Sequence, residues 1–247
     1  MLPNVLDWDS KFFGFSVARV DWSGDVSQIA EAIAHARKMD VTLLYVFGPA
    51  DANFPGNIVN SIVSIFKSQR VELAKELIDG PNLADNPEGI IALAATNCNV
   101  KEVSELGVIA GSHSRFMCDP IIPRTVGERL FRLWAENSLR GVLADANFGY
   151  WSDSRIMGFV SVRRQETGGR IMLIAVRREA RGEGIGSRLV RAAESYVAAT
   201  GGDTITVATQ GHNEPAFRLY HSAGYKEVAR SGVWHVWLKP PSWDKMA

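Results

Sequence analysis

The sequence predicts an α/β fold of the α+β kind, in which helices flank a mixed central sheet. Runs with strand character alternate with runs of helical spacing along the 247 residues, and a glycine-rich turn joins a strand to a helix within residues 170–188. Glycine, proline and polar residues concentrate at 79–88 and predict a linker. We therefore expect two domains, a small α/β domain over residues 1–86 and a larger one over 87–247.

Composition and charge exclude several classes of function. Lys plus Arg number 27, as do Asp plus Glu, so no net charge favours nucleic acid or an acidic membrane. Cys98 and Cys118 lack the spacing of a metal site or a disulfide framework, and we expect reduced thiols and no metal. The first residues lack a signal-peptide pattern, and no apolar run reaches the roughly 18 residues of a membrane span. The expectation is a cytoplasmic enzyme.

In the first domain, strand and helix patterns follow one another. Alternating apolar residues predict a strand before Trp22, the face from Ile29 to Ala36 predicts a helix, and residues 41–47 predict a buried strand. A second helix is predicted from the spacing of four apolar residues, Ile58, Ile62, Ile65 and Phe66. Residues 71–78 fit either type, and we favour a strand.

The second domain alternates in the same way and is richer in strands. Strands are predicted at 90–95, 142–147, 156–163, 171–176, 204–208 and 233–238, with a turn at 151–154 between the second and third. Helices are predicted around 100–107 and 130–141, and after the glycine turn from Ile185. A last helix has Asn213 as its N-cap, Pro215 in its first turn and Gly224 at its end. Residues 112–116 are expected to form a polar loop.

The glycine turn at 181–187 directs free backbone N–H groups and the positive end of a helix dipole toward one place, which favours a phosphate or diphosphate. A Walker loop would need Gly-Lys-Ser/Thr, but the chain has Gly186-Ser187-Arg188. A dinucleotide fingerprint would need glycine where Ser187 stands. The alternative is a turn that uses glycine only for its shape.

These motifs resemble those of the GNAT N-acetyltransferases. The residues Arg181-Gly-Glu-Gly-Ile-Gly186 match their acyl-CoA diphosphate loop, and a second signature follows as Asn213-Glu-Pro-Ala216, Leu219-Tyr220 and Ala223-Gly224-Tyr225. Arg178 departs from the pattern, since many such loops have proline there. The resemblance covers about residues 87–239 and implies a GNAT fold, that is, a mixed and mostly antiparallel central sheet flanked by helices, with a smaller GNAT-like domain before it.

Within the superfamily, the chain resembles the bacterial dTDP-4-amino-4,6-dideoxygalactose (dTDP-fucosamine) N-acetyltransferases. Four segments carry this resemblance: Leu6–Gly14, Ser114–Phe116, Trp134–Asn137 and Val207–Gln210. It implies a transferase that uses acetyl-CoA as acyl donor and acetylates the amine of a nucleotide sugar in cell-surface polysaccharide biosynthesis. A small molecule is then the expected partner, with a homodimer left open and neither nucleic acid nor a membrane involved.

The resemblance also implies roles for particular residues. Tyr220 would be catalytic, protonating the CoA thiolate; the alternative is a packed aromatic on a helix face. The expected cofactor-binding residues are Leu173, Ile174, Ala175, Val176, Arg181, Gly182, Glu183, Gly184, Ile185, Gly186, Ser187 and Asn213, with a backbone N–H of the strand polarising the thioester carbonyl. For Asn213, helix capping is an alternative that can coexist. The expected substrate-binding residues are His113, Ser114, Arg115, Phe116, Glu136 and Asn137.

Two questions stay open at the level of sequence. The general base is His113, Glu136, Asp145 or a chain of waters. The acceptor is an amino-sugar nucleotide in the leading interpretation, and a protein N-terminus or a small amine in the second. A third interpretation is a GNAT module that binds acyl-CoA without catalysis, because a fold does not fix a function. His212 is interpreted as structural.

Overall fold

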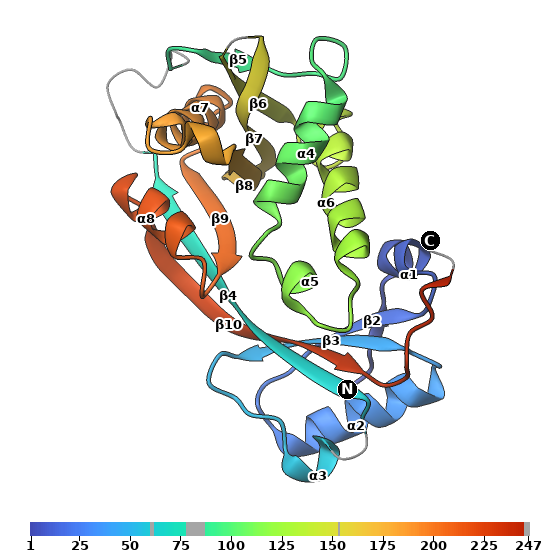
Figure 1. Cartoon of the computed structure of the whole chain (residues 1–247). Coiled ribbons are helices and arrows are strands. Elements are labelled where there is room, and N and C mark those ends of the chain that lie inside the picture. Colours follow the sequence, from blue (N-terminus) through green and yellow to red (C-terminus); the bar gives the residue numbers. More distant parts are fainter. Residues whose placement is uncertain (60–61, 78–86, 153, 245–247) are drawn as a thin grey trace. The chain divides into compact units, whose positions relative to one another are not determined.

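The structure is a computed structural model that describes all residues except 60–61, 78–86, 153 and 245–247. The chain forms two compact units (Figure 1): unit 1 comprises Met1–Val71 and Ala229–Ala247, and unit 2 comprises Glu72–Val228. Most of the predicted linker at 79–88 lies outside the described residues. The division into domains 1–86 and 87–247, which differs from these units in assigning the last strand, therefore stays a prediction.

Unit 1 is a small α/β unit. It contains β1 (Asn4–Val5), α1 (Asp7–Phe13), β2 (Val17–Asp21), α2 (Val26–Lys38), β3 (Leu43–Pro49), α3 (Gly56–Val59), the first part of β4 (Ser64–Glu76) and the last part of β10 (Lys226–Trp237). The strand order is β1-β2-β3-β10-β4. Strands β2 and β3 are parallel, whereas β3 and β10 are antiparallel.

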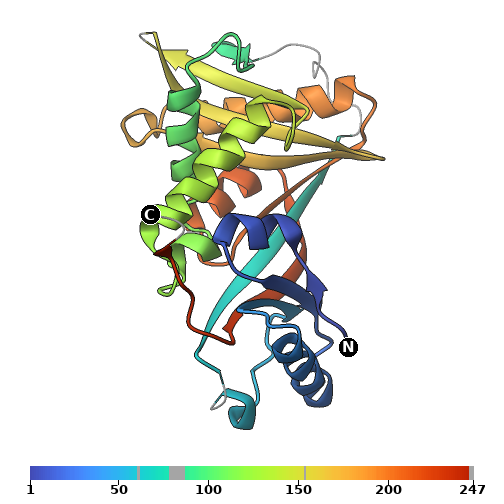
Figure 2. The same cartoon turned by 90° about the vertical axis from the view of Figure 1, so that its right-hand side faces the viewer.

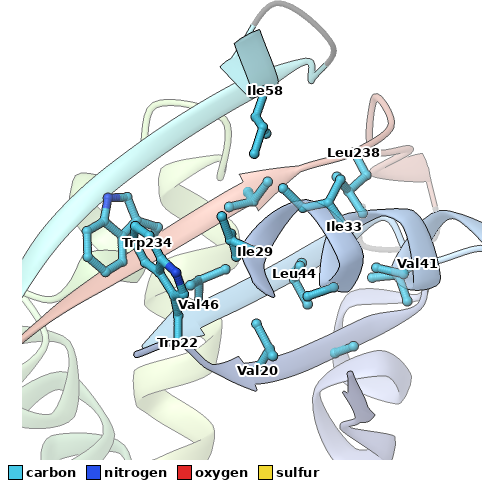
Figure 3. Packing of buried hydrophobic residues seen from close by; sticks show 14 residues of the cluster. Val20, Trp22, Ile29, Ile33, Val41, Leu44, Val46, Ile58, Trp234 and Leu238 are labelled. Atoms are coloured by element: carbon cyan, nitrogen blue, oxygen red, sulfur yellow. The ribbon is translucent and has the colours of Figure 1, made fainter. Parts of the chain in front are cut away.

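The core of unit 1 confirms the helix predicted from Ile29 to Ala36. The side chains of Ile29 and Ile33 on α2 belong to one buried cluster with Leu44 and Val46 of β3 and Trp234 of β10 (Figure 3). Because apolar residues at this spacing share one face of a helix, burying that face fixes α2 on the sheet. The Asp25 side chain caps the helix by accepting a hydrogen bond from the N–H of Ser27.

The helix predicted from Ile58 to Phe66 is wrong. The helix α3 ends at Val59, and Ile65 and Phe66 lie at the start of the 13-residue strand β4. β-Branched and aromatic residues favour strands, and pairing with a neighbouring strand overrides a helical spacing that spans only two turns. The preference for a strand at 71–78 is confirmed as far as Glu76.

Unit 2 contains the last part of β4, β5 (Ile90–Ala92), α4 (Val100–Ala110), α5 (Arg115–Cys118), α6 (Arg124–Leu139), β6 (Ala146–Ser152), β7 (Arg155–Gln165), β8 (Gly168–Val176), a 3₁₀ turn (Arg178–Ala180), α7 (Ile185–Ala199), β9 (Thr204–Gln210), α8 (Glu214–Ser222) and the start of β10. The strand order is β4-β9-β8-β7-β6-β5. Pairs from β5 to β8 are antiparallel and β8 with β9 is parallel.

The helices of unit 2 cover both faces of this sheet. Helices α4 and α6 pack together, and α4 lies on one face of β7 and β8, while α7 lies on the other (Figure 1 and Figure 2). A mixed and mostly antiparallel sheet flanked by helices is the predicted fold class, which is thereby confirmed.

Two local predictions in unit 2 need correction. The strand predicted at 142–147 begins only at Ala146, the first residue of β6, because the N–H groups of Val142 and Leu143 bond to the carbonyl oxygen of Asn137 where α6 ends. The polar loop at 112–116 is partly the short helix α5, and the Ser114 hydroxyl caps it by accepting a hydrogen bond from the N–H of Met117.

Candidate active site

The glycine turn forms the N-terminus of α7 as predicted. Gly182 and Gly184 have φ angles of 89° and 75°, in the left-handed region where a side chain is strained. Gly184 is the N-cap residue of α7, and no side chain caps the helix there. A Cβ atom on either glycine would meet nothing within 4 Å, so both face open space. The first turn of α7 therefore presents uncapped N–H groups at its positive end.

A pocket of about 260 Å³ lies in front of this turn. The residues that line it are Val176, Ala180, Arg181, Gly182, Gly184, Ile185, Gly186, Ser187, Pro215 and Leu219. Two of these come from α8, which approaches α7 closely: a Cβ on Gly186 would lie 3.3 Å from Cδ1 of Leu219. A pocket of this size at a helix N-terminus fits an anionic group such as a diphosphate.

The central strand separates from its parallel neighbour beside the pocket. The pairing of β8 with β9 extends from Gly168 and Thr204 to Ile171 and Val207. Beyond that point β8 continues to Val176 and pairs with β7 on its other side. The strand thus separates from β9 before Val176, which leaves one edge of residues 172–176 available for an extended ligand with amide groups.

Two arginine side chains donate hydrogen bonds to backbone carbonyl oxygens at or beside the glycine turn. The Nε of Arg181 donates to the carbonyl oxygen of Val176 at 3.2 Å, so this side chain folds back over the end of β8. Arg188, which sequence reasoning did not include, donates from Nη2 to the carbonyl oxygen of Glu183 at 2.9 Å, and its guanidinium lies 4.6 Å from the ring centre of Tyr150. Arg188 stands one helical turn after Gly184, and this position could have indicated its contact with the glycine turn.

Helix α8 carries the second predicted signature. The Asn213 Oδ1 accepts from the N–H of Ala216, and its Nδ2 donates to Oγ1 of Thr209 at 3.0 Å, so the capping role is present. Tyr220 is 2% exposed, and its ring centre lies 5.4 Å from that of Tyr225. Burial raises the pKa of Tyr220 above its ordinary value of 10, which keeps its hydroxyl protonated.

Several predicted acceptor residues have partners within the fold. Phe116 is 3% exposed and packs edge-on against Trp134, with the guanidinium of Arg115 4.3 Å from its ring centre. A base could stack on Phe116 only after a rearrangement of these side chains. The Ser114 hydroxyl caps α5, as described above.

Glu136 and Asn137 lie near the C-terminal end of α6. Oε1 of Glu136 accepts a hydrogen bond from Ser104 at 2.8 Å, and the carbonyl oxygen of Asn137 ends the helix. Trp134, two residues before Glu136 on the same helix, packs edge-on against Phe116.

His113 lies beside His212, which the sequence analysis interpreted as structural. Its ring centre lies 5.6 Å from that of His212, and Nε2 of His212 lies 3.9 Å from Sγ of Cys118. Partial burial, then the neighbouring His212 and Arg181, lower the pKa of His113 below its ordinary value. The signal that could have indicated His212 was its position directly before Asn213.

The site thus combines a glycine turn at a helix N-terminus with a central strand that separates from its parallel neighbour. Residues 117–225 match the sequence profile of the Acetyltransferase (GNAT) family. The chain thus contains a GNAT acetyltransferase domain and is an N-acetyltransferase, as the sequence predicted.

Similar proteins agree with this assignment. The chain is 24% identical over 238 residues, 93% of its own length and 81% of the relative's, to the spore coat polysaccharide biosynthesis protein SpsD of Bacillus subtilis. It is 31% identical over 145 residues to a dTDP-fucosamine acetyltransferase of Escherichia coli, a match that covers 58% of this chain and 61% of that relative.

Solved structures share the fold. A GCN5-related N-acetyltransferase from Sphaerobacter thermophilus superimposes with a TM-score of 0.60 at 17% identity, over 97% of this chain and 77% of that one. A functionally unknown protein from Staphylococcus epidermidis gives 0.64 at 14% identity, over 90% and 85%. None of the helices in the described parts of the chain is long and apolar enough to cross a membrane.

Proposed function

We propose that this protein transfers an acetyl group from acetyl-CoA to the amine of an amino-deoxysugar nucleotide by direct attack of the amine. The observation that carries the proposal is the pocket at the N-terminus of α7 beside the separated end of β8. GNAT proteins generally use acetyl-CoA. The acceptor class is supported by the two relatives, one named for polysaccharide biosynthesis and one for acetylation of dTDP-fucosamine.

In this proposal the donor binds along residues that the fold brings together. Backbone N–H groups of residues 182–187, with Arg181, hold the diphosphate. The free edge of Leu173–Val176 pairs with the pantetheine arm, and a backbone N–H there polarises the thioester carbonyl as charge develops on its oxygen. Asn213 contacts the pantetheine while it caps α8.

Tyr220 supplies the proton that the departing thiolate needs. A thiol has a pKa of about 8.5 and a free tyrosine about 10, so transfer of the proton to a thiolate is uphill by roughly 2 kcal/mol even before burial. Burial raises the pKa of Tyr220 further. Its hydroxyl therefore acts as a hydrogen-bond donor that strengthens as the C–S bond breaks, and it does not release a proton beforehand.

The acceptor binds, in this proposal, on the side of His113–Phe116, where Arg115 offers a guanidinium for a diphosphate. In the same proposal, Glu136 and Asn137 contact the acceptor from the C-terminal end of α6. A homodimer and a cytoplasmic location remain predictions from the sequence.

The proposal is tested by thiol release from acetyl-CoA with a panel of amines. We expect release with dTDP- or UDP-linked aminosugars and little with peptides or polyamines. Release only with peptides or small amines would replace the acceptor, and binding of acetyl-CoA without release with any amine would indicate a non-catalytic module.

The role of Tyr220 has its own test within that assay. We expect Tyr220→Phe to lower kcat at least tenfold while the KM for acetyl-CoA stays within twofold. Tyr196→Phe on α7, where the ring packs against Phe148, is the matched control and should retain kcat. An unchanged kcat for Tyr220→Phe would reject the role.

A further inference from the structure

Attack of an amine on a thioester leaves a proton on the nitrogen, and a general base must remove it. The two sequence signatures described above do not identify that base. Of the three side chains that the sequence left open, two are occupied. Oδ2 of Asp145 accepts from the N–H of Arg164 at 2.7 Å, and Glu136 binds Ser104 at 2.8 Å and lies 3.7 Å from Arg140. Both carboxylates hold elements of the fold together.

We propose that His113 is the general base, and that His212, whose ring lies beside it, is a positioning residue. The inference rests on the proposed acetyl transfer to an amine, but not on which amine is the acceptor.

Placement supports this pair. His113 lies in the connection between α4 and α5, and His212 lies between β9 and α8, so two connections 99 positions apart meet at a ring-centre distance of 5.6 Å. Pro215, three residues after His212, lines the pocket, and so does Arg181, whose charge acts on His113. The histidine pair therefore neighbours residues of the pocket wall without lining the pocket itself, and His113 belongs to the segment proposed to receive the acceptor.

The charges around His113 suit a base. Arg181 of the glycine turn and His212 of the β9–α8 connection both disfavour a second positive charge, and partial burial acts in the same direction. On α5, the guanidinium of Arg115 is placed over the ring of Phe116, and the Cys118 thiol adds no charge because burial raises its pKa. The imidazole of His113 is consequently neutral near pH 7 and can accept a proton.

The step balances in atoms and charge. The amine nitrogen forms a bond to the acetyl carbon, and a proton passes from that nitrogen to the free ring nitrogen of His113. The C–S bond breaks, and the thiolate sulfur takes the proton of Tyr220. His113 then loses its proton to water, and Tyr220 regains one from water, so the products are the amide and the CoA thiol.

The test begins with His113→Gln in the full chain, assayed with whichever amine the wild type acetylates. We expect kcat to fall about hundredfold, the typical contribution of a general base. The KM for acetyl-CoA should stay within twofold, and the acidic limb of the kcat pH profile should disappear. His35→Gln on α2 of unit 1 is the histidine-removal control and should retain the wild-type profile.

A second variant separates the role of His212. His212→Gln removes a neighbour that disfavours protonation of His113, so the acidic limb of kcat/KM should move to higher pH while the plateau is retained. Titration of the His113 ring by NMR in the ligand-free protein should show the same upward shift of its pKa, and this readout needs no activity.

Three results would overturn the inference. One is a His113→Gln variant with kcat within threefold of wild type and an unchanged pH profile. Another is a variant that raises only the KM for the amine, which would make His113 a binding residue. The third is an unshifted His113 titration in His212→Gln. A wild type that acetylates no amine would overturn the proposed function as well, whereas the first three outcomes leave it intact.

Discussion

Gly184 offers a sharp test of the donor site, because its substitution by alanine has two separable effects. The residue has φ 75° and ψ 6° and is the N-cap of α7. Alanine in this left-handed conformation costs about 1–2 kcal/mol of folding free energy. The added methyl group would also stand in open space on the wall of the pocket, where, in the proposed function, the backbone approaches a diphosphate closely.

Gly201 provides the matched control. It follows α7, has φ 83°, and a Cβ there would also meet nothing within 4 Å, but it does not line the pocket. Both variants should therefore lose about 1 kcal/mol of stability in urea denaturation. Only Gly184→Ala should weaken acetyl-CoA binding, and we expect at least tenfold, or about 1.4 kcal/mol.

Equilibrium dialysis or calorimetric titration with acetyl-CoA measures the difference directly. Equal affinity in the wild type and both variants would refute the reasoning that the backbone of Gly184 contacts the donor. Equal weakening in both variants would show that backbone strain, transmitted through α7, explains the loss without any contact at the pocket.

Two further predictions concern buried charges in unit 2. Lys75→Met should lower the free energy of unfolding by about 3–5 kcal/mol, because the carboxylate of Glu194, which is 3% exposed and lies 2.8 Å from Nζ of Lys75, would stay buried without its cation. The exposed control Lys101→Met should change the free energy of unfolding by less than about 0.5 kcal/mol. Equal effects of the two variants in urea denaturation would contradict the prediction. The Arg177 guanidinium holds the pKa of Glu105 below its ordinary value, and a depressed carboxyl pKa stabilises the fold above the unfolded pKa of about 4.3. Arg177→Gln should therefore cost about 2 kcal/mol at pH 7 and progressively less below about pH 4, whereas a loss independent of pH would show that only the bond to the Ile156 carbonyl matters.

How far the sequence predicts this fold depends on whether a pattern is long enough to be unambiguous. The face of α7 repeats over four turns, and the helix forms where predicted. The apparent helix from Ile58 to Phe66 rests on four residues, and the strand β4 takes the last two because pairing partners distant in sequence decide their conformation. A periodic pattern within one segment contains no information about such pairing partners.

The backbone of the proposed donor site was predictable because seven consecutive residues form it. In Arg181–Ser187, the glycines themselves indicate the left-handed backbone, and the adjoining strand and helix place the turn. Pro215 and Leu219 complete the pocket at positions four residues apart on α8, which is one helix face. Local patterns are sufficient when a ligand is bound mainly by backbone.

The proposed acceptor side is formed by side chains instead, which is why the same sequence patterns did not predict its arrangement. The rings of His113 and His212 come together only because two connections from distant parts of the chain meet in the fold. The residues that flank either histidine form no motif that indicates the other. The residues that did have a motif, Phe116 and Glu136, are engaged in an aromatic contact and a side-chain hydrogen bond that a resemblance cannot reveal. A site formed by backbone groups can thus be predicted from consecutive residues, whereas a site formed by side chains from distant segments is visible only in the folded structure. The proposed acceptor chemistry is therefore tested first at His113 and His212.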